Sequence, residues 1–245
     1  MAHLQVEHLC KTLGKVHTLQ DVSLRLDENE FVVVLGPSGC GKSTLFHVIA
    51  GLIRPDRGRV LIDSQDFTGQ TGRVSYMQQK DLLLPWRSVL DNVSIPLLLK
   101  GNGQQEARNI ARGYLHDFGL EDFAGYYPCQ LSGGMRQRAA LLRTYLFASD
   151  ILLLDEPFAA LDAITRRKMH VWLKDLRQHY QSSILFVTHD IEEALVLADR
   201  IYLLSARPAT VRLEIDLNNS AGKSRSELKA QIIELLEDED GEAFV

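Results

Sequence analysis

Short apolar runs alternate along the chain with longer stretches of helical periodicity. Between positions 22 and 26 every second residue is apolar, as in a strand with one buried face. Residues 31–35, 151–154 and 184–187 are continuous apolar runs, which are typical of strands covered on both faces. This alternation predicts an α/β fold with a largely parallel sheet.

The helical stretches fill the spaces between these strands. A helix is expected over residues 42–53, because Pro55 and Gly58 then act as stop signals. A second helix over 162–179 would join two of the buried strands into a βαβ unit. Residues 80–146 are mostly helical in pattern, and we interpret them as an insertion into the α/β core.

The predicted organisation is therefore one domain over residues 1–245. Residues 1–79 and 147–245 would form the core, and residues 80–146 an inserted helical subdomain. A chain of 245 residues is long enough to bury a full core. The acidic segment 237–240 is most simply a solvated tail.

Composition narrows the class of protein. Hydrophobic residues make up 45% and charged residues 24%, as in ordinary globular proteins, and the net charge of −5 argues against a nucleic-acid binder. There is no apolar run of the ~18 residues needed to span a bilayer, and no apolar signal segment at the start. We therefore expect a cytosolic protein whose membrane role, if any, comes through a partner. The three cysteines suggest neither a disulfide framework nor a metal site.

The turn after the 31–35 run carries the first chemical signal. It matches the P-loop pattern, in which glycines let backbone N–H groups surround phosphates, a lysine reaches the β- and γ-phosphates, and a serine ligates Mg²⁺. A glycine-rich turn without a ligand is the alternative, which the strand before and the helix after oppose. The pattern does not distinguish a kinase, a GTPase and an ATPase. The residues concerned are Gly36, Pro37, Ser38, Gly39, Cys40, Gly41, Lys42, Ser43 and Thr44.

Two adjacent carboxylates follow the 151–154 run. Asp155 at the strand end suits a ligand of Mg²⁺, and Glu156 suits a base that polarises an attacking water. A polar strand end before a turn is the plain alternative, and the upstream P-loop favours the functional interpretation. A carboxylate that can serve as base favours hydrolysis over transfer to another substrate.

Residues 131–138, LSGGMRQR, look like the signature motif of ABC ATPases. Together with the P-loop and the Asp155–Glu156 pair in the expected order, this motif makes the chain resemble that family over nearly its whole length. Ser132 can cap the following helix, while Gly133 and Gly134 allow close backbone approach. A plain helix cap is compatible with Ser132 but leaves the two glycines unexplained.

Further positions match the family. Gln79 resembles the Q-loop glutamine, although Gln78 beside it competes for that role. Asp162 resembles the D-loop aspartate and is equally a plausible helix cap. His189 resembles the switch histidine that contacts the γ-phosphate. One departure is Leu13, which stands where the family commonly has an aromatic residue that stacks on adenine; His17 is a possible substitute.

Two segments point to a subgroup. Residues 82–93 are similar to importers of the nitrate, sulfonate and taurine group, whose relatives also carry vitamin precursors, and residues 205–208 point the same way. In that family Trp86 would lie near the groove that receives the permease's coupling helix. A core or surface aromatic is the plain interpretation of Trp86.

The resemblance implies an ATP-hydrolysing subunit that works as a homodimer around two ATP molecules, with Mg²⁺. It also implies transmembrane permease subunits and an external solute-binding protein as partners, and a location on the cytoplasmic face of the membrane. It does not imply nucleic acid as a partner. A soluble ABC ATPase of translation or DNA repair, a non-hydrolysing regulatory module and an exporter remain alternatives. The implied catalytic residues are Glu156, His189, Gln79 and Lys42, the metal ligands Ser43, Gln79 and Asp155, and the nucleotide contacts residues 36–44 with Ser132, Gly133 and Gly134 of the other subunit.

Overall fold

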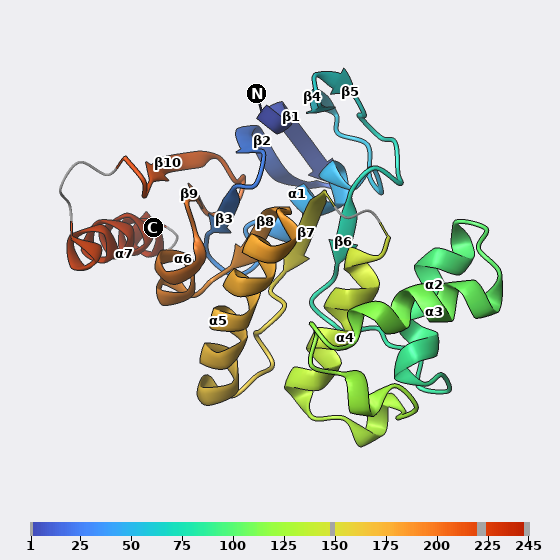
Figure 1. Ribbon diagram of the computed structural model, residues 1–245. Helices are drawn as coiled ribbons and strands as arrows, with labels where there is room; N and C mark the ends of the chain where they lie inside the picture. Colours follow the sequence, from blue (N-terminus) through green and yellow to red (C-terminus); the bar gives the residue numbers. More distant parts are fainter. Residues whose placement is uncertain (1, 148–149, 220–223, 243–245) are drawn as a thin grey trace. The chain divides into compact units, whose positions relative to one another are not determined.

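The computed structural model describes residues 2–147, 150–219 and 224–242, with side chains described up to residue 237 (Figure 1). Most of the acidic segment 237–240 therefore has side chains outside the described residues. The chain divides into two compact units, Met1–Arg73 with Ser182–Val245, and Val74–Gln181. The predicted division at residues 80 and 146 stays a prediction.

The first unit contains an antiparallel sheet with the strand order β2-β1-β4-β5. Every second residue from Val22 to Leu26 of β2 is buried, as the alternating pattern predicts. The strands are β1 (Ala2–Leu13), β2 (Val16–Asp27), β4 (Arg57–Ile62) and β5 (Gln65–Asp66).

The second sheet of this unit is built around β3. Strand β3 pairs in parallel with both β8 and β9, and β9 pairs antiparallel with β10. All residues of β3, β8 and β9 are buried, which explains the continuous apolar runs 31–35 in β3 and 184–187 in β8. The bounds are β3 (Phe31–Leu35), β8 (Ser183–Thr188), β9 (Arg200–Leu204) and β10 (Val211–Asp216), with helices α1 (Lys42–Ile49), α6 (Ile191–Leu197) and α7 (Arg225–Glu242).

Helix α1 ends four residues before its predicted end. Gly51 has a φ of +74°, and a Cβ there would lie 2.1 Å from the backbone oxygen of Gln70. Only glycine fits such a position, and a left-handed residue just after a helix stops it. The close approach of residue 70, which is not visible in the local sequence, therefore sets the end of α1.

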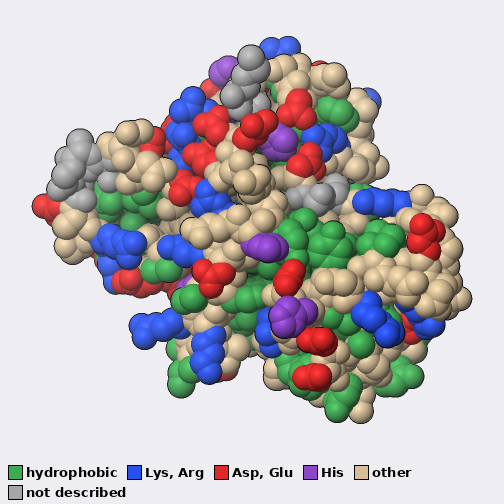
Figure 2. All heavy atoms as spheres, in the orientation of Figure 1, with side chains coloured by type: hydrophobic (Ala, Val, Ile, Leu, Met, Phe, Trp, Pro, Cys, Tyr) green, Lys and Arg blue, Asp and Glu red, His purple; other side chains and the backbone are tan. Residues whose placement is uncertain are grey.

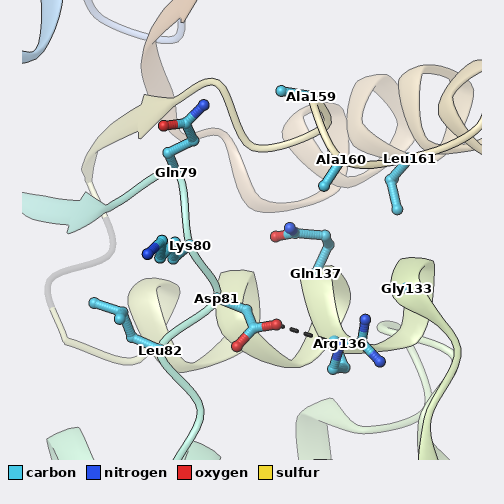
Figure 3. A pocket seen from close by; sticks show the side chains of 10 residues that line it. All are labelled: Gln79, Lys80, Asp81, Leu82, Gly133, Arg136, Gln137, Ala159, Ala160 and Leu161. Atoms are coloured by element: carbon cyan, nitrogen blue, oxygen red, sulfur yellow. Dashed lines mark ion pairs between the residues drawn. The ribbon is translucent and has the colours of Figure 1, made fainter.

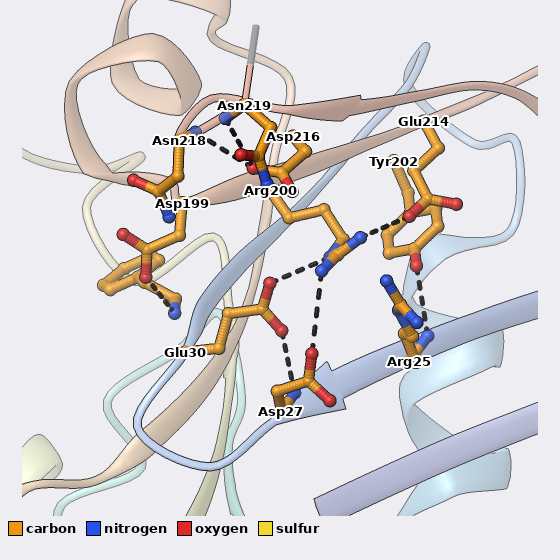
Figure 4. A network of polar contacts seen from close by, with 11 residues as sticks. Arg25, Asp27, Glu30, Asp199, Arg200, Tyr202, Glu214, Asp216, Asn218 and Asn219 are labelled. Carbon is orange, nitrogen blue, oxygen red and sulfur yellow. Dashed lines mark hydrogen bonds and ion pairs between the residues drawn. The ribbon is translucent and has the colours of Figure 1, made fainter. Parts of the chain in front are cut away.

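Arg200 lies at the centre of a network of carboxylates (Figure 4). Its Nε is 2.8 Å from Glu30, its Nη1 is 2.5 Å from Glu214, and its Nη2 is 3.6 Å from Asp27. The Arg200 and Glu30 side chains are only 7% and 11% exposed, so water screens this pair weakly. These contacts raise the pKa of Arg200 despite its burial, and they join the start of β9 to the β2–β3 turn and to β10.

Replacing Arg200 with alanine is expected to destabilise the protein by about 3 kcal/mol, because it leaves the Glu30 carboxylate largely buried without its positively charged partner. Urea unfolding measures this loss. The matched control is Arg212→Ala in β10, an exposed position, where we expect a change below about 0.5 kcal/mol. Equal midpoints for the Arg200 variant and the wild-type protein would show that the network contributes no stability.

The second unit joins a pair of parallel strands to helices. Strand β6 pairs with β7, with Tyr76 opposite Leu153 and Met77 opposite Leu154. The helices expected between residues 80 and 146 all lie in this unit, as does the predicted helix over 162–179. The bounds are β6 (Ser75–Met77), α2 (Val89–Leu99), α3 (Gln104–Tyr114), the 3₁₀ turns η1 (Glu121–Phe123) and η2 (Pro128–Gln130), α4 (Gly133–Tyr145), β7 (Ile151–Asp155) and α5 (Ala163–Tyr180).

The surface carries charges of both signs. On the face drawn in Figure 2, Lys and Arg side chains are interspersed with Asp and Glu. None of the helices in the described residues is long and apolar enough to cross a membrane.

Candidate active site

The glycine-rich turn of the first unit connects β3 to α1. Lys42, the first residue of α1, is 5% exposed, and its Nζ donates hydrogen bonds of 2.8 Å to the backbone oxygens of Gly36 and Pro37. The ammonium group therefore lies inside the turn, with the backbone folded around it. Ser43, by contrast, is exposed.

Close packing explains two of the glycines in this turn. A Cβ on Gly36 would lie 3.1 Å from the backbone oxygen of Leu204. Gly41 has a φ of +132°, and a Cβ there would lie 3.0 Å from the Cγ2 atom of Thr18. Strand β9 and the start of β2 therefore press on the turn, and larger residues at these positions would displace it.

His189 follows β8 in the same unit, and its neighbours hold the segment in place. The Thr188 hydroxyl donates a 2.5 Å hydrogen bond to Glu193, which is 5% exposed. The Asp190 carboxylate caps α6 by accepting from the backbone N–H groups of Glu192 and Glu193. His189 itself is exposed at the end of the strand, so it can contact a ligand.

The two adjacent carboxylates lie at the end of β7 in the second unit. Asp155 is 5% exposed, and its Oδ2 accepts a 3.2 Å hydrogen bond from the Tyr76 hydroxyl. Glu156 has a φ of +44°, which is uncommon for a residue with a side chain. The Nε2 of Gln79 lies 3.3 Å from the Oε2 of Glu156. This contact brings two of the predicted site residues together, while the choice of Gln79 over Gln78 as the Q-loop glutamine stays a prediction.

Tyr76 is a site residue that the sequence patterns did not indicate. Burial and the Asp155 charge raise the pKa of its hydroxyl, so Tyr76 stays protonated and donates to the carboxylate. The sequence signal for Tyr76 is its position on the short strand β6, three residues before Gln79. Because hydrogen bonds from neighbouring groups orient metal-binding carboxylates, Tyr76 is suited to position Asp155.

If Asp155 binds Mg²⁺ as the sequence predicts, replacing Tyr76 with phenylalanine should raise the Mg²⁺ concentration required for half-maximal ATP hydrolysis by about 10-fold, because Asp155 loses the hydrogen bond from the Tyr76 hydroxyl. A Mg²⁺ titration of activity and of ATP affinity measures this effect, and saturating Mg²⁺ should restore most of the rate. Tyr202→Phe is the matched control, a buried tyrosine of β9 whose hydroxyl accepts from the Arg25 backbone. An unchanged Mg²⁺ requirement in the Tyr76 variant would exclude this positioning role.

The signature-like segment begins α4, also in the second unit. Ser132 caps the helix by accepting a 3.3 Å hydrogen bond from the Met135 backbone. A Cβ on Gly133 would lie 3.1 Å from Leu161, and one on Gly134 would lie 3.0 Å from Thr165. The segment before α5 and the first turn of α5 therefore pack on both glycines. This intrachain packing is one reason for the pair, beside the close approach to a ligand predicted from the sequence.

Asp162 caps α5, with its carboxylate accepting from the backbone N–H groups of Ile164 and Thr165. These bonds lower the pKa of Asp162. The helix-cap interpretation of this residue is thus confirmed, while its role as a D-loop residue stays a prediction.

A pocket of about 580 Å³ opens between three segments of the second unit (Figure 3). The Asp81 carboxylate points toward Arg136 on α4, at 3.3 Å, and Arg143 donates to the backbone oxygens of Leu82 and Asp81. The segment after Gln79 is therefore held against the signature helix by two arginines. The pocket is lined by residues 79–82, 159–161, Gly133, Arg136 and Gln137.

The side chains that could bind a metal suit Mg²⁺, which needs few protein ligands, better than a metal held by protein side chains alone. Among the described residues, no three His, Cys, Asp or Glu side chains gather into a metal site. Mg²⁺ usually takes one or two protein oxygens and completes its shell with phosphate oxygens and water. The Asp155 carboxylate and the Ser43 hydroxyl are each an oxygen donor of this kind. Each side chain therefore fits Mg²⁺ by its chemistry, and a magnesium site built from them stays a prediction.

Comparison with known proteins decides the family. The model of the ABC transporter family matches residues 19–159, which include the glycine-rich turn, the signature segment and both carboxylates. The chain belongs to the ABC transporter family. The family membership confirms that it is an ATP-binding subunit that energises a transporter.

Similarity to characterised and named relatives covers most of this chain and most of each relative. The formylaminopyrimidine import ATP-binding protein ThiZ of Halalkalibacterium halodurans is 42% identical over 90% of each chain. The nitrate import ATP-binding protein NrtD of Synechocystis is 42% identical over 88% of this chain and 83% of its own. The taurine import ATP-binding protein TauB of Pseudomonas aeruginosa is 44% identical over 86% and 82%.

Solved ABC cassettes have the same fold. The dimeric bacterial cassette MJ0796 superposes with a TM-score of 0.75 at 34% identity, over 87% of this chain and 98% of its own. A post-hydrolysis dimer of the same cassette, bound to ADP and Pi, superposes with a TM-score of 0.74 at 33% identity over the same shares. The predicted α/β P-loop fold with antiparallel N-terminal strands is thereby confirmed.

The structure groups the predicted site residues by unit. The first unit holds the glycine-rich turn with Lys42, and His189; the second holds Gln79, Asp155, Glu156 and the signature segment. Leu13, at the position where the family commonly has an aromatic residue, is 40% exposed at the end of β1.

Proposed function

We propose that this subunit hydrolyses ATP with Mg²⁺ as a homodimer and thereby drives an importer. The observation that carries the proposal is the arrangement at the end of β7. There the buried Asp155 carboxylate is fixed by a donor, and the next residue, Glu156, is held by Gln79. One carboxylate can then bind metal while the other acts on water.

In this proposal each predicted residue has a distinct role. Lys42 and the N–H groups of residues 36–44 bind the phosphates of ATP. Glu156 accepts a proton from the attacking water, Gln79 orients Glu156 and the metal complex, and His189 contacts the γ-phosphate. Asp155 and Ser43 would hold Mg²⁺, which supplies charge neutralisation at the phosphates.

The signature segment acts on the nucleotide of the other subunit. Ser132 and the N–H groups at the start of α4 present a partial positive charge suited to a γ-phosphate. The dimeric form of the similar MJ0796 cassettes supports such a composite site. Binding of ATP would favour the closed dimer, and hydrolysis would favour opening, because the γ-phosphate bridges both chains.

A complementation experiment tests the composite site. One variant carries Lys42→Ala, which damages its own phosphate site, and the other carries Gly133→Asp, which places a negative charge where the partner's phosphate would bind. Each should be inactive alone. Mixed, they form one intact site from the first variant's signature segment and the second variant's P-loop, so phosphate release should reappear.

The contrary result is equally clear. If P-loop and signature segment of the same chain formed one site, every chain in the mixture would be damaged and no activity would return. Hydrolysis at full specific rate by a strict monomer would also contradict the proposal. Analytical ultracentrifugation of the same samples shows which species is present.

We further propose that two copies act on transmembrane permease subunits at the cytoplasmic face of the membrane, with an external solute-binding protein. The cargo class would be a small organic or inorganic anion or a vitamin precursor, as the names of the nitrate, taurine and formylaminopyrimidine relatives suggest. Reconstituted with the co-purifying permease and binding protein, hydrolysis should be stimulated by one of these cargo classes. If none of these cargo classes stimulates hydrolysis, the cargo assignment is contradicted. The ATPase assignment is then still tested by the complementation experiment.

A further inference from the structure

The turn between β9 and β10 is built against the glycine-rich loop. Residues 205–210 form this turn, and Leu204 immediately before it packs on Gly36. Ala209, which is fully buried, accepts a 2.9 Å hydrogen bond from the Gln20 backbone and donates one of 2.9 Å to Thr18. Thr18 in turn contacts Gly41. Both ends of the turn are therefore anchored to residues that touch the loop.

Ser205 fixes the turn internally. Its hydroxyl contacts the backbone oxygens of Ala206 and Pro208 and accepts from the Thr210 backbone at 2.9 Å. The backbone N–H of Ser205 also donates to Thr210 at 3.0 Å. A turn closed on both sides in this way holds its central residue, Arg207, at a defined place.

Arg207 projects from this turn over the glycine-rich loop. A Cβ on Gly39, which has a φ of +77°, would lie 3.1 Å from the Nη2 atom of Arg207. Arg207 is exposed, and within the described residues no carboxylate or carbonyl partners its guanidinium. A second cation, from a different part of the chain than Lys42, therefore lies beside the loop without an acidic partner.

An anion is what this arrangement lacks. The N–H groups of the loop, the start of α1 and Lys42 already make the site electropositive, so an unpaired guanidinium beside them is unfavourable until negative charge enters. Arginine binds phosphate through two parallel N–H···O bonds, which suits a polyphosphate better than a single charge. Resting on the proposed function of this loop, we propose that Arg207 binds the terminal phosphates of the nucleotide held by the same chain.

The experiment compares nucleotides that differ in phosphate number. Affinities of the full chain for a non-hydrolysable ATP analogue, ADP and AMP are measured by displacement of a fluorescent nucleotide, for the wild type, Arg207→Ala and Arg207→Lys. The matched control is Arg212→Ala, which removes an exposed positive charge from the same β-hairpin. Thermal melting confirms that each variant is folded.

We expect Arg207→Ala to bind the ATP analogue and ADP about 10-fold more weakly or worse, with AMP affinity changed less than about twofold, since only the outer phosphates lose a charge-assisted bond. Arg207→Lys should retain part of the affinity, and Arg212→Ala nearly all of it. Unchanged affinity of Arg207→Ala for the ATP analogue, or an equal loss for AMP, would overturn the proposal.

Two other results are separately informative. If nucleotide affinity stays normal and only dimer formation weakens, Arg207 contacts the partner chain and the phosphate assignment is overturned. If the wild-type protein binds none of the nucleotides, the proposed function of the loop fails together with this inference. If the wild-type protein binds nucleotides normally and Arg207→Ala binds them equally well, only the role of Arg207 is overturned and the proposed function of the loop stands.

Discussion

Replacing Glu156 with glutamine is expected to lower the rate of ATP hydrolysis by about 100-fold or more while ATP still binds, because a neutral amide cannot accept the proton of the attacking water. The substitution changes little else. Glutamine has the same length, and its side-chain oxygen can still accept from the Gln79 amide at 3.3 Å. The uncommon backbone conformation at position 156 suits glutamine as well as glutamate.

The same substitution should also change the state of assembly. With ATP bound and not consumed, the γ-phosphate keeps bridging the chains, so a stable dimer should accumulate. Phosphate release gives the rate, and light scattering with and without ATP gives the dimer fraction. The control is Glu121→Gln, an exposed glutamate of the same unit. If Glu156→Gln hydrolyses ATP at a rate within a few-fold of the wild type, Glu156 is not the base.

Replacing Lys42 with alanine is expected to weaken ATP binding by about 100-fold, since a charged hydrogen-bond donor to phosphate is lost together with the order it gives the loop. Lys42 is almost fully buried and bonded to the oxygens of Gly36 and Pro37, so it shapes the turn as well as carrying charge. Displacement of a fluorescent nucleotide measures the affinity.

Two controls separate charge from volume in that experiment. Lys42→Met keeps the aliphatic stem and removes the ammonium, and it should lose nearly as much affinity as the alanine variant. Lys15→Ala removes an exposed cation from the β1–β2 turn of the same unit and should bind normally. If the alanine variant bound ATP as tightly as the wild type, residues 36–44 would not be the phosphate site.

The amino-acid sequence by itself determined the features that depend on neighbouring residues. The buried strands β3, β7 and β8 are recognisable because a strand covered on both faces must be continuously apolar. The glycine-rich turn and the Ser132 cap are recognisable because their chemistry needs particular residues a few positions apart. Such features can be recognised in a single sequence, because residues a few positions apart along the chain are also close together in space.

Only the tertiary structure decided which distant residues meet. Tyr76 and Asp155 are 79 positions apart, and their contact follows from the parallel register of β6 and β7. The packing of Leu161 on Gly133 and the approach of Arg207 to Gly39 likewise join segments far apart in sequence. No local pattern encodes these contacts, because they arise from how strands align and how loops pack on one another. Tyr76, Leu161 and Arg207 could therefore be recognised as neighbours of the predicted site residues only from the tertiary structure.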